Sequence, residues 1–228
     1  MDNTSTIPAL DKQQILAAYK YRHATKVFDS SRRISEEDFG FILETGRLSP
    51  SSFGFEPWKF VVVQNPGVRQ KLLPYAWGAQ KQLPTASHFL LILARQPRDM
   101  AAGSDYIQGM MREVQKLPPE IAEGKSRVYD GFLKSDFELE GNERAMFEWG
   151  VRQTYLPLGN MMTAAALIGI DSCPIEGFDK QKIEQVLADE GIMDPEHFGI
   201  ACMAAFGYRA GEPRAKTRQT AAQVVEWV

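Results

Sequence analysis

Two short basic clusters, separated by almost the whole chain, carry the side chains best suited to bind an anion. Residues 22–26 read RHATK and residues 214–218 read RAKTR. Guanidinium and ammonium groups form short, charge-assisted hydrogen bonds to phosphate and carboxylate oxygens. Taken singly, the first cluster also fits a solvated basic turn, and the second fits a frayed tail. They indicate an anion site only if the fold brings them together.

Two loops could approach a ligand with backbone and hydroxyl groups. Residues 48–58, LSPSSFGFEPW, combine serine hydroxyls, a glycine and two prolines in a rigid, donor-rich loop. Residues 174–178, PIEGF, stand at the end of a predicted strand, where Gly177 permits close approach of the main chain. The ordinary alternatives are a helix-to-strand connection with Trp58 in the core and a simple turn.

Several familiar catalytic and metal-binding motifs are missing from the sequence. It contains no GxGxxG after a strand, no GxxxxGK[ST], no GxSxG and no HExxH. The three histidines and two cysteines have no spacing typical of a metal centre. We therefore expect no metal site. We interpret Cys173 and Cys202, which have apolar neighbours, as buried reduced thiols, with a disulfide between them left open.

The composition restricts the partners and the location. Of 228 residues, 44% are hydrophobic and 24% are charged, as in ordinary globular domains. The net charge of −3 gives no general attraction to nucleic acid or to acidic membranes. The first residues lack the basic and apolar regions of a signal peptide, and the apolar stretch 161–170 is about half of what a bilayer requires. We expect a cytoplasmic protein without nucleic-acid or membrane partners.

Hydrophobic periodicity predicts a single α+β domain over residues 1–228, with residues 1–10 disordered. Short β-rich apolar runs indicate strands, and apolar residues that recur every three or four positions indicate helices. Residues 99–139 are polar with scattered apolar side chains, which we interpret as two exposed helices. The other predicted helices span 11–20, 35–48, 142–168 and 179–190, and the predicted strands span 59–64, 88–94, 171–175 and 199–208.

Two segments require partners. The predicted helix 142–168 is apolar around more than one face, so it must be buried in a core or between subunits, and Pro157 predicts a kink in it. The tail 223–228, QVVEWV, resembles a strand. A strand at a chain end must pair with another strand, because it otherwise leaves an exposed edge.

Taken in order along the chain, these motifs resemble the nitroreductase family of flavoenzymes. The order is R-H-x-T-K, then S-P-S-S with P-W-x-F, then A-S-H before an apolar strand, then P-I-E-G-F, then K-x-R. The resemblance runs from Lys20 to Arg218 and is greatest to oxygen-insensitive nitroreductases and related quinone reductases. It implies a mostly antiparallel central sheet surrounded by helices. It also implies a homodimer that exchanges its C-terminal strands and holds its FMN sites at the subunit interface.

The resemblance assigns roles to individual residues. The phosphate of FMN is expected at the two basic clusters, and the pyrimidine edge of the flavin at Lys26 and Gln82. The loop around Ser51 is expected to complete the neighbouring subunit's site. The backbone N–H of Glu176 is expected to face N5, with Gly177 against the ring. The expected cofactor-binding residues are Arg22, His23, Ala24, Lys26, Pro50, Ser51, Ser52, Gly54, Gln82, Ile175, Glu176, Gly177, Lys216 and Arg218.

The sequence departs from the family pattern at four positions. Ala24 stands where serine is common, Gly54 and Ala79 stand where asparagine is common, and Glu56 replaces a neutral amide. Each change removes or alters a polar group near the expected ligand. FMN is therefore expected to bind less tightly than in typical members.

The implied reaction is a ping-pong transfer of hydride from NADH or NADPH, through N5 of FMN, to a small aromatic acceptor such as a nitroaromatic or a quinone. The cofactor carries this chemistry, so no acid–base side chain is expected. Two alternatives stay open. One is a non-reductase flavoenzyme of the same fold, dehalogenating or flavin-cleaving, and the other is a flavin-binding or storage protein without turnover. The choice between NADH and NADPH and the natural acceptor also stay open.

Overall fold

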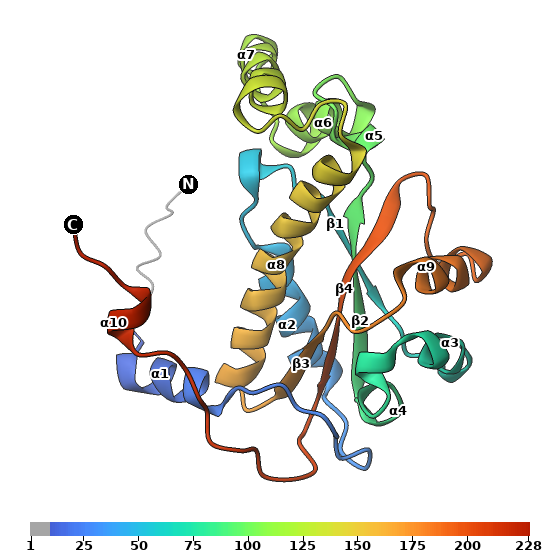
Figure 1. Ribbon diagram of the computed structural model, residues 1–228, viewed down its shortest axis with the longest axis vertical. Coiled ribbons are helices and arrows are strands. Elements are labelled where there is room, and N and C mark those ends of the chain that lie inside the picture. The colour runs from blue at the N-terminus through green and yellow to red at the C-terminus, as the bar shows by residue number, and fades with distance from the viewer. Residues whose placement is uncertain (1–9) are drawn as a thin grey trace.

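A four-stranded antiparallel sheet forms the centre of the protein (Figure 1). The structure is a computed structural model that describes residues 10–228, so the expected disorder of residues 1–10 falls outside the described residues except at Leu10. The α+β class and all four predicted strands are confirmed, with ends within two residues of those expected. In spatial order the strands are β1 (Trp58–Val62), β2 (His88–Arg95), β4 (Phe198–Gly207) and β3 (Asp171–Ile175).

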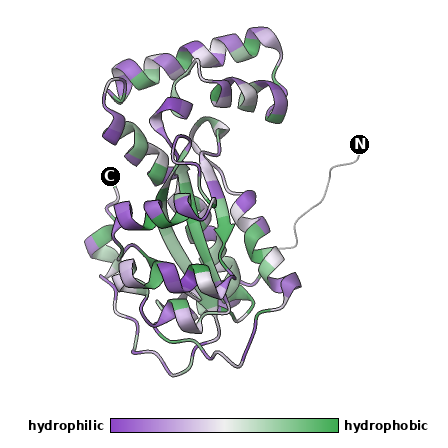
Figure 2. Cartoon of the chain, turned by 90° about the vertical axis from the view of Figure 1, so that its right-hand side faces the viewer, coloured by the Kyte–Doolittle hydropathy of each residue, from purple (hydrophilic) through white to green (hydrophobic). Residues whose placement is uncertain are grey.

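Helices cover both faces of this sheet (Figure 1). Alternate residues of β2 serve different cores, because successive side chains of a strand point to opposite faces. Leu91 belongs to the cluster on the α3, α4 and α9 side, whereas Ile92 belongs to the cluster on the α2 and α8 side. Figure 2 shows the hydrophobic residues gathered on the sheet. These helices are α2 (Glu36–Arg47), α3 (Pro66–Leu72), α4 (Gln82–Thr85), α8 (Glu143–Leu167) and α9 (Lys180–Asp189).

Local signals explain where the first helices begin. The Asp11 carboxylate accepts a hydrogen bond from the backbone N–H of Gln13 and caps α1 (Lys12–Tyr21). The Ser35 hydroxyl caps α2 in the same way, followed by three acidic residues that suit the positive end of the helix dipole. Both helices were predicted, whereas α3 was not anticipated.

The long helix α8 buries one side against the sheet and α2 and leaves another side open. It continues without interruption through Pro157. Its buried side includes Trp149 and Met161, whereas Tyr155 and Leu156 are 38% and 46% exposed. The predicted helix is therefore confirmed. Part of its apolar surface is not covered by any of residues 10–228 in a single chain.

Residues 97–139 differ from the prediction of two exposed helices. The segment does contain two main helices, but their inner faces enclose a third hydrophobic core with Phe55 and Trp149. Tyr129 is fully buried there, and its hydroxyl donates to the Met100 carbonyl at 2.7 Å. The apolar residues looked scattered because their partners come from distant parts of the chain. The helices are α5 (Pro97–Met100), α6 (Asp105–Gly109) with a π-helical turn Met110–Val114, and α7 (Pro119–Gly131) with a π-helical turn Phe132–Asp136.

The C-terminal tail is not a strand in the single chain, so that prediction was wrong for its first part. Residues 221–224 form a short helix, α10 (Ala221–Val224). The Gln223 side chain accepts a hydrogen bond from the Thr220 backbone N–H at 2.9 Å, and this capping box favours a helical turn. From Val225 onward the backbone is exposed and pairs with no strand among residues 10–228. The exchange of tails between subunits stays a prediction.

Both cysteines are buried and unpaired with each other, as predicted. Among residues 10–228, no helix is both long enough and apolar enough to cross a membrane. Within the same residues, no group of three or more His, Cys, Asp and Glu side chains is placed to hold a metal ion.

Candidate functional site

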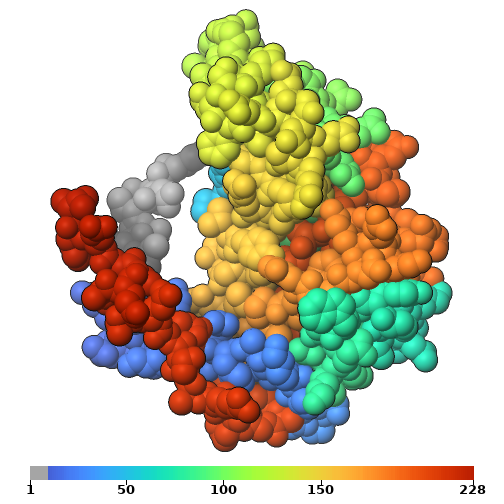
Figure 3. Space-filling view, in the orientation of Figure 1, coloured from blue at the N-terminus to red at the C-terminus, as the bar shows by residue number. Residues whose placement is uncertain are grey.

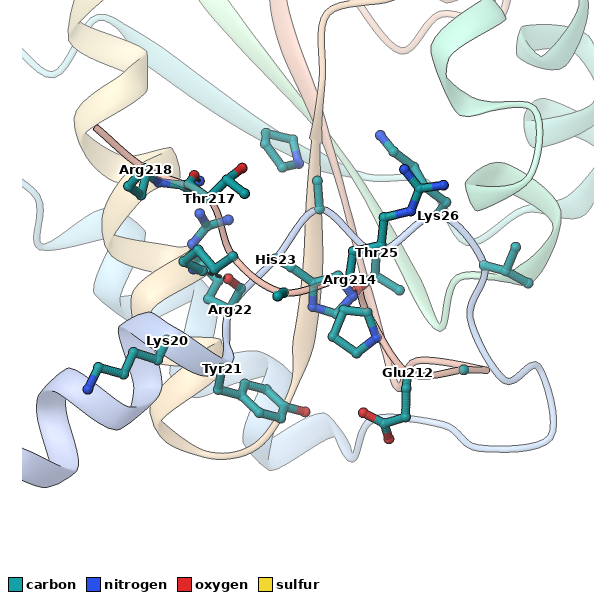
Figure 4. A pocket seen from close by; sticks show the side chains of 17 residues that line it. Lys20, Tyr21, Arg22, His23, Thr25, Lys26, Glu212, Arg214, Thr217 and Arg218 are labelled. Atoms are coloured by element: carbon teal, nitrogen blue, oxygen red, sulfur yellow. Dashed lines mark hydrogen bonds between the residues drawn. The ribbon is translucent and has the colours of Figure 1, made fainter. Parts of the chain in front are cut away.

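The two basic clusters meet at one cavity of about 800 Å³ between the end of α1 and the C-terminal tail. Figure 4 shows the tail crossing the loop that follows α1, with basic side chains from both segments around the opening. Of the predicted site residues, the cavity is lined by Arg22, His23, Ala24, Lys26, Lys216 and Arg218. Residues almost 200 positions apart in the sequence therefore form one site.

Lys216 fastens the tail to the end of α1. Its ammonium group donates hydrogen bonds to the carbonyl oxygens of Tyr19 and Arg22. A cation is favourable there, because the last carbonyls of a helix have no helical partner and form the negative end of its dipole. Figure 3 shows the tail lying over α1 at the surface. This anchoring role was not foreseen from the sequence.

The cavity carries an excess of positive charge. Its lining includes one carboxylate, Glu212, and six lysine and arginine side chains. The pKa of Lys216 is lowered, first by partial burial and then by repulsion from Arg22 and Arg218. An anion placed among these three groups would relieve that repulsion. The six cationic residues are Lys20, Arg22, Lys26, Arg214, Lys216 and Arg218.

A buried carboxylate behind the cavity binds two of its lining residues, Tyr21 and Thr25. Asp171, at the start of β3, is 2% exposed and pairs with Arg209, whose Nε lies 2.9 Å from Oδ1. The hydroxyls of Tyr21 and Thr25 also donate to this carboxylate. Burial, and then Arg209, lowers the pKa of His23, which favours the neutral imidazole. The sequence offered no signal for this network, because it depends on segments about 150 residues apart.

The first basic cluster runs beside β3, and this places Lys26. Ala24 forms a parallel bridge with Ser172. Farther along, the Lys26 ammonium and the Gln82 amide both reach the thiol of Cys173, at 3.8 and 3.6 Å from its sulfur. The prediction that Lys26 and Gln82 serve one edge of a ligand is compatible with this convergence. Cys173 had been interpreted only as a buried thiol, so its contact with both groups was missed.

Gly177 makes its close approach to another part of the chain. The Gly78 N–H donates to the Gly177 carbonyl at 2.6 Å. A Cβ on Gly177 would lie 2.8 Å from the Cα of Gly78 and 2.9 Å from the Trp77 ring, too close without movement. From the sequence, Gly177 was explained by a flavin ring expected to lie against it. The structure gives a second reason, because Gly78 and Trp77 leave no room for a Cβ at this position.

The Glu176 side chain has a partner that the sequence did not reveal. Its carboxylate accepts a hydrogen bond from the hydroxyl of Tyr155 on α8. Burial, and then this bond, raises the pKa of Tyr155, so the phenol keeps its proton. The pair ties the turn after β3, where Ile175 is buried, to the long helix. From the sequence, only the backbone N–H of Glu176 was expected to matter. The structure adds a role for its carboxylate, which holds the turn in place through Tyr155.

The loop containing Pro50, Ser51, Ser52 and Gly54 does not line the cavity. It lies beside α8, where the Ser52 N–H donates to the Gln153 side-chain carbonyl at 2.8 Å. Gly54 has a φ of +67°, a left-handed conformation that glycine and asparagine both adopt readily. The departure from asparagine therefore preserves the backbone. The assignment of this loop to the neighbouring subunit's site stays a prediction.

Comparison with known proteins identifies the family. The model of the Nitroreductase family matches residues 19–208. The chain is 56% identical over 217 residues to the Bacillus subtilis (strain 168) protein named Putative NAD(P)H nitroreductase YfkO, covering 95% of this chain and 98% of that protein. A Staphylococcus epidermidis protein named as another putative NAD(P)H nitroreductase is 53% identical, with 95% and 97% covered.

Solved structures share the fold. A putative nitroreductase from Exiguobacterium sibiricum, crystallised in complex with FMN, aligns with a TM-score of 0.76 at 21% identity, over 96% of this chain and 98% of that one. A putative NAD(P)H:FMN oxidoreductase from Staphylococcus epidermidis aligns with a TM-score of 0.75 at 24% identity, over the full length of both chains. The chain therefore belongs to the nitroreductase family.

Proposed function

We propose that the protein is an FMN-dependent oxidoreductase that uses NADH or NADPH to reduce nitroaromatics, quinones or similar small aromatic acceptors by a ping-pong mechanism. The observation that supports this most is the meeting of Arg22, Lys216 and Arg218 at one cavity with unneutralised positive charge. A phosphate dianion suits three such groups better than a neutral ligand does. The FMN bound by the Exiguobacterium sibiricum relative, and the NAD(P)H nitroreductase names of the relatives similar in sequence, support the same choice.

The residues present fit FMN. Arg22 and Arg218 offer guanidinium donors to the phosphate, and Lys216 orders the tail that carries Arg218. Lys26 and Gln82 lie together and would hold the pyrimidine edge. The chemistry that FMN supplies when bound is acceptance of hydride at N5 and its delivery to the acceptor in a second half-reaction. The Glu176 N–H, in a turn fixed by Tyr155 and Gly78, would orient the ring.

Anaerobic addition of NADH to the FMN-loaded protein tests this proposal. We expect the visible flavin band to bleach rapidly and to return when a quinone or a nitroaromatic is added. A storage protein without turnover would stay yellow. Bleaching that no aromatic acceptor reverses would favour a non-reductase flavoenzyme and would contradict the proposal.

We also propose that the protein works as a homodimer with FMN sites at the interface. Exposed apolar side chains gather on α1, on α8 and in the tail, where Trp227 is 93% exposed. Large uncovered apolar surfaces of this kind commonly mark protein interfaces. The extended residues after α10 would find a strand partner in the second subunit.

Deletion of residues 223–228 is expected to weaken dimerisation and FMN retention together. If FMN binds at the interface, flavin binding and subunit association are linked by mass action. Sizing chromatography over a range of protein concentrations, with the flavin absorbance recorded, measures both. Deletion of Val228 alone, which leaves Trp227 in place, is the control. A truncated monomer that keeps its flavin would contradict the shared interface.

A further inference from the structure

The loop Ser51–Glu56 has a backbone conformation that its own residues do not favour. Phe53 has a φ of +57° and Glu56 a φ of +48°, with Gly54 between them at +67°. The left-handed region suits glycine but is disfavoured for residues with a Cβ. Such conformations persist only where surrounding contacts impose them, and they gather at functional sites. Some other part of the protein must therefore hold this loop.

The helical segment 97–139 supplies those contacts. The Gln115 amide donates to the Phe53 and Gly54 carbonyls at 3.2 and 2.7 Å. The Lys125 ammonium donates to the Phe53 carbonyl and to the Gln115 side-chain carbonyl, both at 2.7 Å. Lys125 and Gln115 thus form one connected hydrogen-bond network on the carbonyls of Phe53 and Gly54.

Packing reinforces this network. Phe55 is fully buried in the core of the helical segment, and Phe53 stacks on it with 5.7 Å between ring centroids. The Tyr106 hydroxyl lies 2.6 Å from the Phe55 carbonyl. Burial lowers the pKa of Lys125, and no carboxylate of the described residues offsets this effect. A partly buried cation without an acidic partner is costly, so its orientation toward backbone carbonyls indicates a specific role.

Two hydrogen bonds inside the loop connect Ser51 to the segment that Lys125 and Gln115 contact. The Gly54 N–H donates to the Ser51 carbonyl at 3.0 Å, and the Glu56 N–H donates to the Ser51 hydroxyl oxygen at 2.8 Å. Both bonds span Phe53, whose φ is +57°. The Ser51 proton and the Ser52 hydroxyl are left available to a ligand, since no hydrogen bond from either is found within residues 10–228.

We propose that Lys125 and Gln115 are positioning residues. They hold the Ser51–Glu56 loop in its left-handed conformation and thereby set the serine donors of the flavin site that this loop completes in the neighbouring subunit. The second half of this statement rests on the proposed function. That Lys125 and Gln115 hold the loop conformation concerns the single chain and does not depend on FMN. It gives residues 97–139 a role in the site, although they lie in a separate part of the fold.

The test uses Lys125→Met and Gln115→Met, singly and together, in the full-length protein. Methionine matches the length of glutamine, is one atom shorter than lysine, and removes the hydrogen bonds of both. Lys125→Arg, which keeps a positively charged hydrogen-bond donor at this position, is expected to behave like the wild type. Lys134→Met is the matched control, because Lys134 lies in the same helical segment but pairs with Asp130 at the surface. Thermal unfolding of each variant identifies any global loss of structure.

Two readouts separate the halves of the proposal. Hydrogen exchange of peptides covering residues 50–58, measured on the flavin-free protein, is expected to accelerate at least tenfold in the double variant. Titration with FMN, followed by quenching of flavin fluorescence, is expected to show a Kd at least tenfold higher. The Lys134→Met control is expected to change neither quantity.

Unchanged exchange in the double variant would overturn the proposal. Faster exchange with an unchanged Kd for FMN would overturn the link to the flavin site while leaving the proposed function standing. A wild-type protein that binds no FMN would remove the proposed function and, with it, the flavin part of this inference.

Discussion

Replacement of Lys216 and Arg218 together by alanine is expected to weaken FMN binding by about 2–4 kcal/mol, roughly 30- to 900-fold in Kd. Hydrogen bonds to charged groups contribute about 1.5–3 kcal/mol each and rarely add fully when they share one ligand. The structure adds a second reason, because Lys216 also ties the tail to the carbonyl oxygens of Tyr19 and Arg22. Loss of that anchor would move Arg218 away from the cavity.

Equilibrium dialysis of FMN against the purified double variant measures this effect. Arg127→Ala is a suitable control, since Arg127 is an exposed partner of Glu123 on α7, outside the cavity. Added salt is expected to reduce the difference in Kd for FMN between the wild type and the double variant, because dissolved ions screen charge interactions. Full flavin retention by the double variant would mean that the tail does not hold the phosphate.

The sequence predicted the elements whose cause is local. The strands β2 and β4 are buried on both faces, so each reads as a continuous apolar run whatever surrounds it. The starts of α1 and α2 were marked by capping residues, Asp11 and Ser35, next to the helices they cap. Only the start of the tail was misjudged, since Gln223 and Val224 belong to α10; a β-rich composition indicates a strand only where a partner strand is present.

The site was predictable only in part, for a related reason. Motif order placed Arg22, Lys26 and Lys216 at a common ligand, and the cavity brings these residues together. Contacts between distant segments left no mark in the sequence. Examples are the bond from Tyr155 to Glu176 and the network from Lys125 to the loop at Phe53. Each contact joins residues that belong to no recognisable motif, so their roles become visible only in the folded chain.

Gly177→Val is expected to cut flavin occupancy, the rate of flavin reduction by NADH, or both, at least tenfold. The new side chain would meet the Gly78 backbone and the Trp77 ring at distances that normal packing excludes. Overpacking of this kind typically costs about 1–3 kcal/mol, and it must move either the turn or the segment against it. A displaced turn would shift the Glu176 N–H from the position expected to face N5, and small misplacements cost much in hydride transfer.

Glu176→Ala and Tyr155→Phe are the matched comparisons, because each breaks the bond between the carboxylate and α8 while leaving the turn backbone intact. Both are expected to lower the reduction rate by less than Gly177→Val does, and by similar amounts, since they remove the same contact. Stopped-flow reduction of the three variants, loaded with equal FMN, ranks them. If Glu176→Ala were the most damaging while Tyr155→Phe behaved like wild type, the carboxylate itself would act in the reaction. The backbone assignment of this turn would then be wrong.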